Sequence, residues 1–544
     1  MLRYSRIITL LAVSVLILSS CHSKPDHRKY IPKDAAVVAG INLSSLSKKI
    51  AWNMITGSKI FKEMEKKVPK KNGSDVMSGI DKAGIDVLNT FYVYLKTDNR
   101  FNTGMRVTAL VPINDAAAWE AYLKKSFPQA NVTEHNKLKV TSLDGNMYMG
   151  WNKDLLIIMN VLSDNAGDMA AEMDNAFAIT DDNSIKANKN FEKLEGAGHD
   201  LSMWVNYDQI MSSYNDRMAP NMNGVSLSKS MWKETAFACG FDFVKGKITG
   251  DMTYYTSKSM DKIYKEFGTE HVNKEMISRI PGNELSMLVA AHFSTKALKD
   301  MMDSTGVLGL ANSGLSAQGT NVDNVLDAFT GDMAFAINNL SVTSTPATKD
   351  IPYAMQNTNY CMSYVMKINK KANFDQLMNF AKQAGMLPIG EGYMMPVSAR
   401  DSVFVLSNND YAVFSNKYAN ASNILHGNKD GQPLNSNVAA NVNGHPFAMF
   451  IDIQETIKRI DLNAIMSPQD AGIFNESKTL LTNIAFNGGE YKDGAMQAHM
   501  EINFTNKEES SILTLLDFGM RISDAMEKSR AAQQAEIDTT MHAF

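Results

Sequence analysis

The chain contains one short pattern twice, as IPKDAAVVAGINLSSL at 31–46 and as IPGNELSMLVAAHFST at 280–295. Each copy opens with Ile-Pro and a short polar turn. Each then continues as an apolar stretch of strand length and ends in a Ser- or Thr-marked helix start. A pattern that recurs at a long interval is typical of an internal duplication, so we compared the rest of the chain with itself.

Three further pairs of segments recur in the same order: WNKDLLIIMN (151–160) with SNNDYAVFSN (407–416), GHDLSMWVNYDQI (198–210) with GHPFAMFIDIQET (444–456), and FDFVKGKITGDMTYY (241–255) with GEYKDGAMQAHMEIN (489–503). Each match alone is weak, but the four intervals agree to within ten residues. Small loop insertions account for such differences, because folds tolerate them well. We therefore predict a tandem duplication, with a first repeat at 30–265, a connector at 266–278 and a second repeat at 279–525.

Each half is predicted to be a mixed α+β domain. Short runs rich in β-branched and aromatic residues indicate strands, for example 90–96 (TFYVYLK) and 402–406 (SVFVL). Helical patterns lie between them, at 116–125 and 374–382, and an apolar stripe at helical spacing closes each half. The expected architecture is mainly antiparallel sheets with helices packed on them. Whether the two halves share one sheet or form separate domains is left open.

The N-terminus reads MLRYSRIITLLAVSVLILSSC and is predicted to be a lipoprotein signal peptide, residues 1–20. Arg3 and Arg6 provide the positive region, and 7–18 is uncharged and largely apolar. This stretch is shorter than the about 20 residues that span a membrane. Leu18-Ser19-Ser20-Cys21 resembles the lipobox of bacterial lipoproteins, which implies that Cys21 carries the lipid and becomes the first mature residue. The alternative is an ordinary secretory signal that ends near a cysteine.

Residues 21–29 are predicted to form a lipidated, flexible tether, because HSKPDHRK is polar and lacks apolar periodicity. Acyl chains such as palmitate on Cys21 would hold the protein to a membrane, since two or more chains give stable anchoring. The polar stretch 526–544 is predicted to be a C-terminal tail. The expected location is the cell envelope, most readily the outer membrane, with the periplasmic or surface face undetermined.

Composition excludes some classes of protein. The formal net charge of the precursor is −4, without the basic stripe of a nucleic-acid binder. Cys239 and Cys361 both lie in apolar, strand-like contexts, which favours buried thiols, although an oxidising envelope would permit a disulfide. No C-x-x-C occurs.

No residue is predicted to be catalytic, cofactor-binding or metal-binding. Ser45-Leu46-Ser47-Lys48 and Ser259-Met260-Asp261-Lys262 match S-x-x-K, but the companion motifs of penicillin-recognising enzymes are absent. His199 and His445 occupy equivalent repeat positions without a second ligand at metal spacing, so local hydrogen bonding is the better interpretation. A sequence at 428–431 resembles a calcium loop without its distal glutamate.

The lipobox followed by YIPKDAAVVAGINLSSL (30–46) resembles the opening of a family of uncharacterised Bacteroidota envelope lipoproteins, a domain-of-unknown-function family. The resemblance implies an envelope location and no activity, so no site residue follows from it.

Three hypotheses for function remain. The first is a non-enzymatic binding or scaffolding lipoprotein, with an envelope protein or glycan as partner. The second is a surface lipoprotein that binds glycan or polymer, and the third is a hydrolase of unrecognised type. Irregular stretches at 215–230, 311–321, 341–358 and 426–444 are the predicted candidates for a binding surface, and the alternative is that they are disordered insertions between strands.

Overall fold

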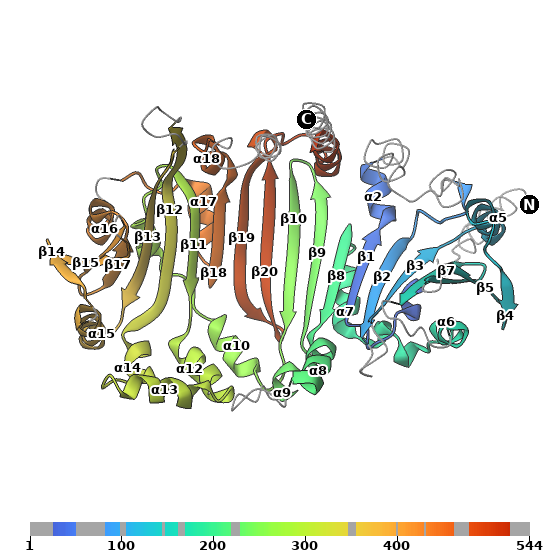
Figure 1. The fold of residues 1–544 in the computed structure, drawn as a ribbon, viewed down its shortest axis with the longest axis horizontal. Coiled ribbons are helices and arrows are strands. Elements are labelled where there is room, and N and C mark those ends of the chain that lie inside the picture. Colours follow the sequence, from blue (N-terminus) through green and yellow to red (C-terminus); the bar gives the residue numbers. More distant parts are fainter. Residues whose placement is uncertain are drawn as a thin grey trace, which may run out of the picture.

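The structure is a computed structural model of the chain, and it describes residues 25–50, 82–97, 105–143, 147–161, 169–218, 229–345, 355–383, 385–398, 401–428, 431–461 and 478–522. In this part of the chain twenty strands form one open sheet, and all pairings between these strands are antiparallel. Figure 1 shows the strands side by side along the long axis of the molecule. The predicted α+β class, with mainly antiparallel strands and packed helices, is confirmed.

The first ten strands of the sheet, counted inward from one edge, come from the first half of the chain. In spatial order they are β4 (Thr133–His135), β5 (Leu138–Leu143), β6 (Met147–Trp151), β7 (Leu155–Val161), β3 (Met105–Pro112), β2 (Thr90–Thr97), β1 (Val37–Asn42), β8 (Leu201–Asn206), β9 (Ala236–Val244) and β10 (Lys247–Tyr255).

The other ten strands, counted inward from the opposite edge, come from the second half. They are β14 (Leu387–Ile389), β15 (Gly392–Pro396), β16 (Ser402–Ser407), β17 (Tyr411–Ser415), β13 (Met355–Ile368), β12 (Phe329–Thr345), β11 (Leu285–His292), β18 (Phe447–Asp452), β19 (Leu481–Lys492) and β20 (Ala495–Phe504). The connectivity of the first ten strands is therefore repeated, as a tandem duplication requires.

The two halves meet where β10 pairs with β20, antiparallel, from Lys247 opposite Asn503 to Tyr255 opposite Ala495. This pairing resolves the alternative left open by the sequence, because it joins the two copies edge to edge into one continuous sheet. Each copy thereby covers one exposed edge of the other, and such edges are otherwise prone to aggregate.

Matched turns explain why the segments that recur in the sequence recur in the fold. Asn152 accepts hydrogen bonds from the backbone of Asp154 and Leu155, and Asn408 does the same for Asp410 and Tyr411, all at 2.8–2.9 Å. These Asx turns connect β6 to β7 and β16 to β17. The hairpins β9–β10 and β19–β20 turn at two glycines with positive φ, Gly246 (+67°) and Gly494 (+79°).

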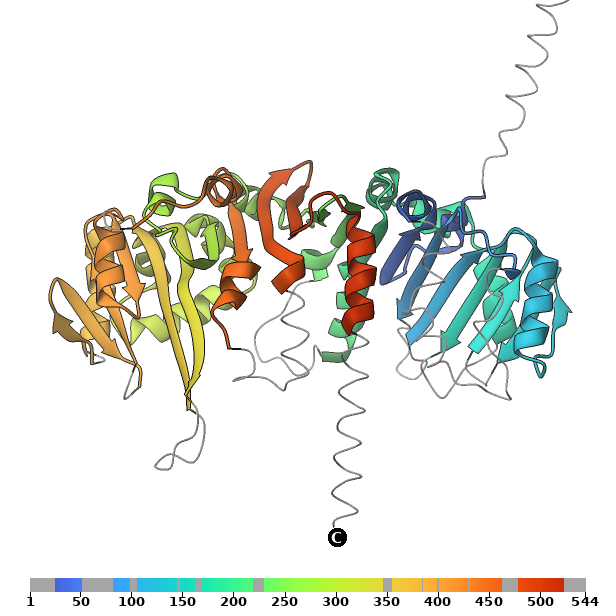
Figure 2. The same cartoon turned by 90° about the horizontal axis from the view of Figure 1, so that it is seen from above.

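Helices cover both faces of the sheet (Figure 2), and others lie at the ends of the strands (Figure 1). They are η1 (His27–Tyr30), α2 (Leu43–Lys49), α5 (Ala116–Ser126), α6 (Met169–Phe177), η4 (Asp181–Asn183), η5 (Ile185–Ala187), α7 (Lys189–Gly196), α8 (Tyr207–Met218), α9 (Lys229–Trp232), α10 (Asp261–Phe267), α11 (Lys274–Ser278), α12 (Thr295–Ser304), α13 (Val307–Ser316), α14 (Val322–Asp327), α15 (Lys371–Gln383), α16 (Tyr418–Leu425), α17 (Ser436–Val442) and α18 (Ile453–Lys458).

The apolar run in β7 reflects helices on both of its faces. Leu155 and Ile157 pack in one core with α6 and α7, whereas Leu156 packs in another with α5. The second half repeats this arrangement, with α16 and α17 in one core and α15 in the other. Burial on both faces favours continuous apolar runs rather than alternation.

Several predicted segment boundaries differ from the structure. The tether was expected to reach residue 29, but His27–Tyr30 form η1 and pack on the body. The connector at 266–278 holds α11, whose Met276 and Ile277 are buried in the core of the second half. Apolar side chains at helical spacing, which the polar flanking residues obscured, explain the ordered connector.

The predicted irregular stretches are also largely regular. Residues 311–321 overlap α13, 426–444 contain α17, and the described parts of 341–358 belong to the strands β12 and β13. Their Asn, Ser and Gly content suggested loops, but tertiary packing outweighs such weak preferences. Parts of 215–230 and of 341–358, and all of 526–544, lie outside the described residues.

Candidate ligand site in the second half

An open polar hollow of about 460 Å³ lies between α17 and the strands β18, β19 and β20. Its volume is within the range of about 300–1,000 Å³ that is usual for small-molecule sites. Its walls carry side-chain amides, two carboxylates, a threonine and a lysine, while Val438, Phe450 and Ala485 provide an apolar floor. The amides belong to Asn435, Asn437, Asn441, Asn483 and Asn503.

The strand register places the polar side chains in one row. Asp452 of β18 lies opposite Asn483 of β19, which lies opposite Asn503 of β20. Residues directly opposite one another point to the same face of a sheet, so all three side chains project toward α17. The next row toward the core holds Phe450, Ala485 and Glu501, which makes the hollow apolar beneath part of its polar rim.

Helix α17 provides the other wall. Asn435 caps the helix by accepting a hydrogen bond from the backbone of Asn437 at 2.9 Å. Asn437 and Asn441 lie one turn apart and therefore on the same side of the helix. Val438 is buried and fixes this side against the sheet.

Some of the amides are used by the fold and others are not. Asn441 Nδ2 donates to the carbonyl of Met449 at 3.1 Å, and its Oδ1 accepts from Asn487 at 3.0 Å. Asn503 donates to Asn483 at 3.0 Å, which leaves one half of each of these amides available. Two side chains of the hollow, Asn437 and Thr482, have no hydrogen-bond partner within the part of the chain that the structure describes.

The charges of the hollow are balanced. Glu501 forms an ion pair with Lys247 of β10. Burial opposes ionisation of Glu501, but the Lys247 ammonium outweighs it and holds the pKa of the carboxyl below its usual range. The Asp452 carboxylate caps α18 by accepting a hydrogen bond from the backbone N–H of Glu455. Burial raises the pKa of the Asp452 carboxyl. Lys507 adds a second positive charge at the rim.

The equivalent position in the first half holds three aromatic rings, and a smaller hollow of about 350 Å³ lies beside them, with Leu194, Ala238 and Tyr255 among its lining residues. Phe191 of α7 packs edge-on against Trp204 of β8, with ring centroids 5.9 Å apart, and Trp204 lies 5.9 Å from Tyr255 of β10. All three side chains are at most 9% exposed. Aromatic contacts of this kind contribute about 0.5–1.5 kcal/mol beyond the burial of area.

The strand registers and the matched helix caps give the equivalences. In the first half Trp204 pairs with Ala238, and Ala236 pairs with Tyr255. In the second half Phe450 pairs with Ala485 in the same way, and Asn483 pairs with Asn503. Asn188 caps α7 as Asn435 caps α17. The second half therefore has Val438, Asn483 and Asn503 where the first has, respectively, Phe191, Ala236 and Tyr255.

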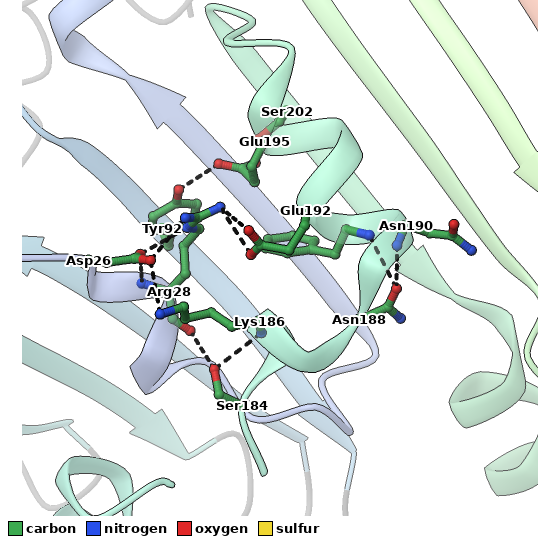
Figure 3. Close-up of polar contacts among 11 residues, drawn as sticks. Asp26, Arg28, Tyr92, Ser184, Lys186, Asn188, Asn190, Glu192, Glu195 and Ser202 are labelled. Carbon is green, nitrogen blue, oxygen red and sulfur yellow. Dashed lines mark hydrogen bonds and ion pairs between the residues drawn. The ribbon is translucent and has the colours of Figure 1, made fainter. Parts of the chain in front are cut away.

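A second polar cluster holds η1 on the first half (Figure 3). Arg28 binds Asp26 through two nitrogens, at 2.8 and 2.9 Å, and reaches Glu192 of α7 at 3.0 Å. Lys186 lies 3.3 Å from Asp26, and the hydroxyl of the buried Ser184 donates to the carbonyl of Arg28 at 3.0 Å. The ion pair with Asp26 raises the pKa of Arg28 against the effect of burial.

Next to it, Glu195 accepts hydrogen bonds from Tyr92 at 2.5 Å and from Ser202 at 2.6 Å. Burial and the neighbouring Glu195 carboxylate raise the pKa of the Tyr92 phenol. Because the charges of Asp26, Arg28 and Glu192 are engaged with one another, this cluster is suited to hold η1 rather than to bind a charged ligand.

The structure gives His199 and His445 the same local role. His199 Nδ1 lies 2.7 Å from Asp242 of β9, and His445 Nδ1 lies 2.5 Å from Glu490 of β19. Each histidine follows a glycine with positive φ, and its imidazole pairs with a carboxylate on a nearby strand. In the part of the chain that the structure describes, no group of three or more His, Cys, Asp or Glu side chains could hold a metal ion.

The other residues singled out in the sequence are not brought together. The Ser259 hydroxyl donates to the carbonyl of Ser230 at 2.8 Å, and Ser45 lies in the first turn of α2. Cys239 and Cys361 are free, buried thiols, and burial raises the pKa of Cys239 to about 11. Cys21 and the centre of the 428–431 loop lie outside the described residues.

Sequence reasoning named 426–444, which includes the α17 residues that line the hollow, as a candidate binding surface, but it missed the strand residues of the hollow. The available signal was the alignment of 241–255 with 489–503, in which Tyr255 stands opposite Asn503.

Within the described ranges no helix is long and apolar enough to cross a membrane.

Fold and site together define a tandemly duplicated α+β protein. Its second copy carries an open polar hollow beside α17, where the first copy has an aromatic stack with a smaller hollow beside it. The chain belongs to the family described as Domain of unknown function (DUF4836), whose model matches residues 27–486. No curated protein was found to match it.

Among solved structures the chain is similar to crystal forms of TP0453. Form IV is 7% identical, with 42% of this chain and 80% of that chain covered and a TM-score of 0.26. Form III is 8% identical, with 48% and 89% covered and a TM-score of 0.27. Likeness at this level carries no argument about fold or function.

Proposed function

We propose that this chain is a lipid-anchored protein of the cell envelope whose body is a non-enzymatic binding module. Cys21 carries the lipid, and the hollow beside α17 receives the ligand. The first half acts as a structural platform that carries the tether.

The difference between the two copies carries this proposal. A duplicated domain starts with two equivalent cores, and one of them still has a stack of three aromatic rings. In the second copy Val438 and Asn503 replace two of these rings, which gives up aromatic packing at the edge of a core that is otherwise buried. Polar groups without partners in a concave site are what ligand binding requires.

The anchor is supported by the sequence and by the position of η1. Residues 1–20 have the composition of a lipoprotein signal peptide, ending at Cys21. The Arg28 cluster holds the chain from Asp26 onward. Only a few residues would then separate the membrane from the first half, so the body would stay close to the lipid surface.

Metabolic labelling of the full chain with an alkyne analogue of palmitate tests the anchor. Wild-type protein should take up the label and sediment with membranes. Cys21→Ala should lose the label and leave the membrane fraction, whereas Cys239→Ala, a buried thiol elsewhere in the chain, should keep both. Equal labelling of wild type and Cys21→Ala would contradict the proposal.

A further inference from the structure

We propose that the hollow beside α17 binds a neutral saccharide. This inference rests on the proposed function, because it names the class of ligand that the binding module takes. It is carried by the hydrogen-bonding groups, the charge balance and the apolar floor of the hollow.

The free polar groups match hydroxyls. Each hydroxyl of a sugar can donate one hydrogen bond and accept others, so a sugar site needs donors and acceptors close together. The hollow offers both, since the unpartnered Asn437 amide has an NH₂ and a carbonyl, Asn483 keeps its NH₂, and Asn503 keeps its carbonyl. The Thr482 hydroxyl adds a group that can do either.

The charge balance argues against an ionic ligand. Lys247 neutralises Glu501, and the remaining Asp452 carboxylate and Lys507 ammonium are of opposite sign. A phosphorylated or acidic ligand needs an excess of cations, as a cationic ligand needs an excess of carboxylates. A neutral ligand has neither requirement, so it suits this site.

The floor suits the apolar side of a sugar ring. Phe450, Val438 and Ala485 lie beneath the amide row, and Phe450 is 7% exposed. The C–H groups of a pyranose can pack on such a surface while its hydroxyls reach the amides at the rim. The hollow of about 460 Å³ is open, so the end of a longer glycan chain could enter as well as a short free one.

The test uses the mature body, residues 25–544, on an array of neutral gluco-, manno-, galacto- and N-acetylglucosamine oligosaccharides, and of intact polysaccharides that end in the same sugars. The best oligosaccharide is then titrated by calorimetry. Binding to oligosaccharides alone would identify a free sugar as the ligand, and binding to both would identify a chain end.

Variants assign the binding to the hollow. Asn437→Ala should weaken binding about tenfold, and Asn503→Tyr, which introduces the ring found at Tyr255, should abolish it. The matched control is Asn190→Ala, because Asn190 occupies on α7 the position of Asn437 on α17. It should bind like wild type. Circular dichroism and thermal unfolding check that each variant is folded.

Two results would overturn the inference: no binding to any neutral sugar at millimolar concentration, or equal binding by folded wild type, Asn437→Ala and Asn503→Tyr. The proposed anchoring is judged separately by the Cys21 labelling. A labelled, membrane-bound protein that binds no sugar would leave the lipoprotein assignment standing and refute the ligand class.

Discussion

At the scale of single residues, one position distinguishes the two copies most clearly. Tyr255 ends β10 with its ring against Trp204, whereas Asn503 of β20 presents an amide to an open hollow. A buried ring contributes dispersion and hydrophobic energy to folding, and a half-used amide in a concave site contributes to recognition instead. The exchange of one residue type thus changes what the position does.

A buried ion pair in the second half has a measurable pH dependence. His292 and Asp332 are 6% exposed, and His292 Nδ1 lies 3.1 Å from Asp332 Oδ1. Asp332 also accepts from the backbone of Asn273 at 3.0 Å and from Thr330 at 2.8 Å, and Glu270 lies 3.4 Å from the far nitrogen of the imidazole. The hydrogen bond to Asp332 raises the pKa of His292 against the effect of burial.

The folded chain therefore holds a proton at His292 more tightly than the unfolded chain, whose histidines titrate near about 6.5. The stabilisation is complete below that pH and is lost as the pH rises through the folded-state pKa. We expect wild type to lose about 1 kcal/mol more of its free energy of unfolding than His292→Gln between pH 6 and pH 8.5. Urea unfolding at the two pH values measures this, and equal losses in both proteins would show that the pair does not titrate.

At the scale of elements, the sequence predicted what depends on local chemistry. The Asx turns at Asn152 and Asn408 and the turn glycines Gly246 and Gly494 were visible as repeated motifs, because each satisfies a local backbone requirement.

The sequence did not predict what depends on contacts between distant segments. Helix α13 is rich in Gly and Ser and carries few local helix signals, so it was expected to be a loop. The β10–β20 pairing joins residues about 250 positions apart, and no local pattern specifies it. The hollow arises from the pairing of β18, β19 and β20 and from α17, so its strand residues and its helix residues do not occur together in any one motif.

The element η1 provides a test of how the body is attached to its tether. A chain that begins at Pro25 keeps the Arg28 cluster and the contact of Tyr30 with Phe177, whose ring centroids are 5.6 Å apart. A chain that begins at Ile31 loses both. We expect the free energy of unfolding of the second chain to be lower than that of the first by roughly 2 kcal/mol or more, since hydrogen bonds between charged groups contribute about 1.5–3 kcal/mol.

Chemical unfolding of the two truncated chains, followed by circular dichroism, makes this comparison. Equal free energies of unfolding would mean that η1 only rests on the surface and that the flexible tether extends through residue 29, as the sequence predicted.

At the scale of the whole molecule, the β10–β20 pairing makes one sheet out of two copies. Ala495 of the second half is buried in the core of the first, so the core of the first half is not complete without the second. We expect a chain that ends at residue 270 to expose β10 and to self-associate, because an unpaired edge strand is a template for another strand. Size-exclusion chromatography of residues 25–270 checks this, and a stable monomer would show that the first half needs no partner.

The central claim is that one copy supports the fold and the other is open for a ligand. The free energies of unfolding of two reciprocal variants, Tyr255→Asn and Asn503→Tyr, test it most directly. Loss of the Tyr255 ring from a packed core should cost about 3 kcal/mol or more, whereas a ring at 503 enters existing space and should change stability by less than about 1 kcal/mol. Equal destabilisation by the two variants would mean that both copies are packed alike, and would contradict the account.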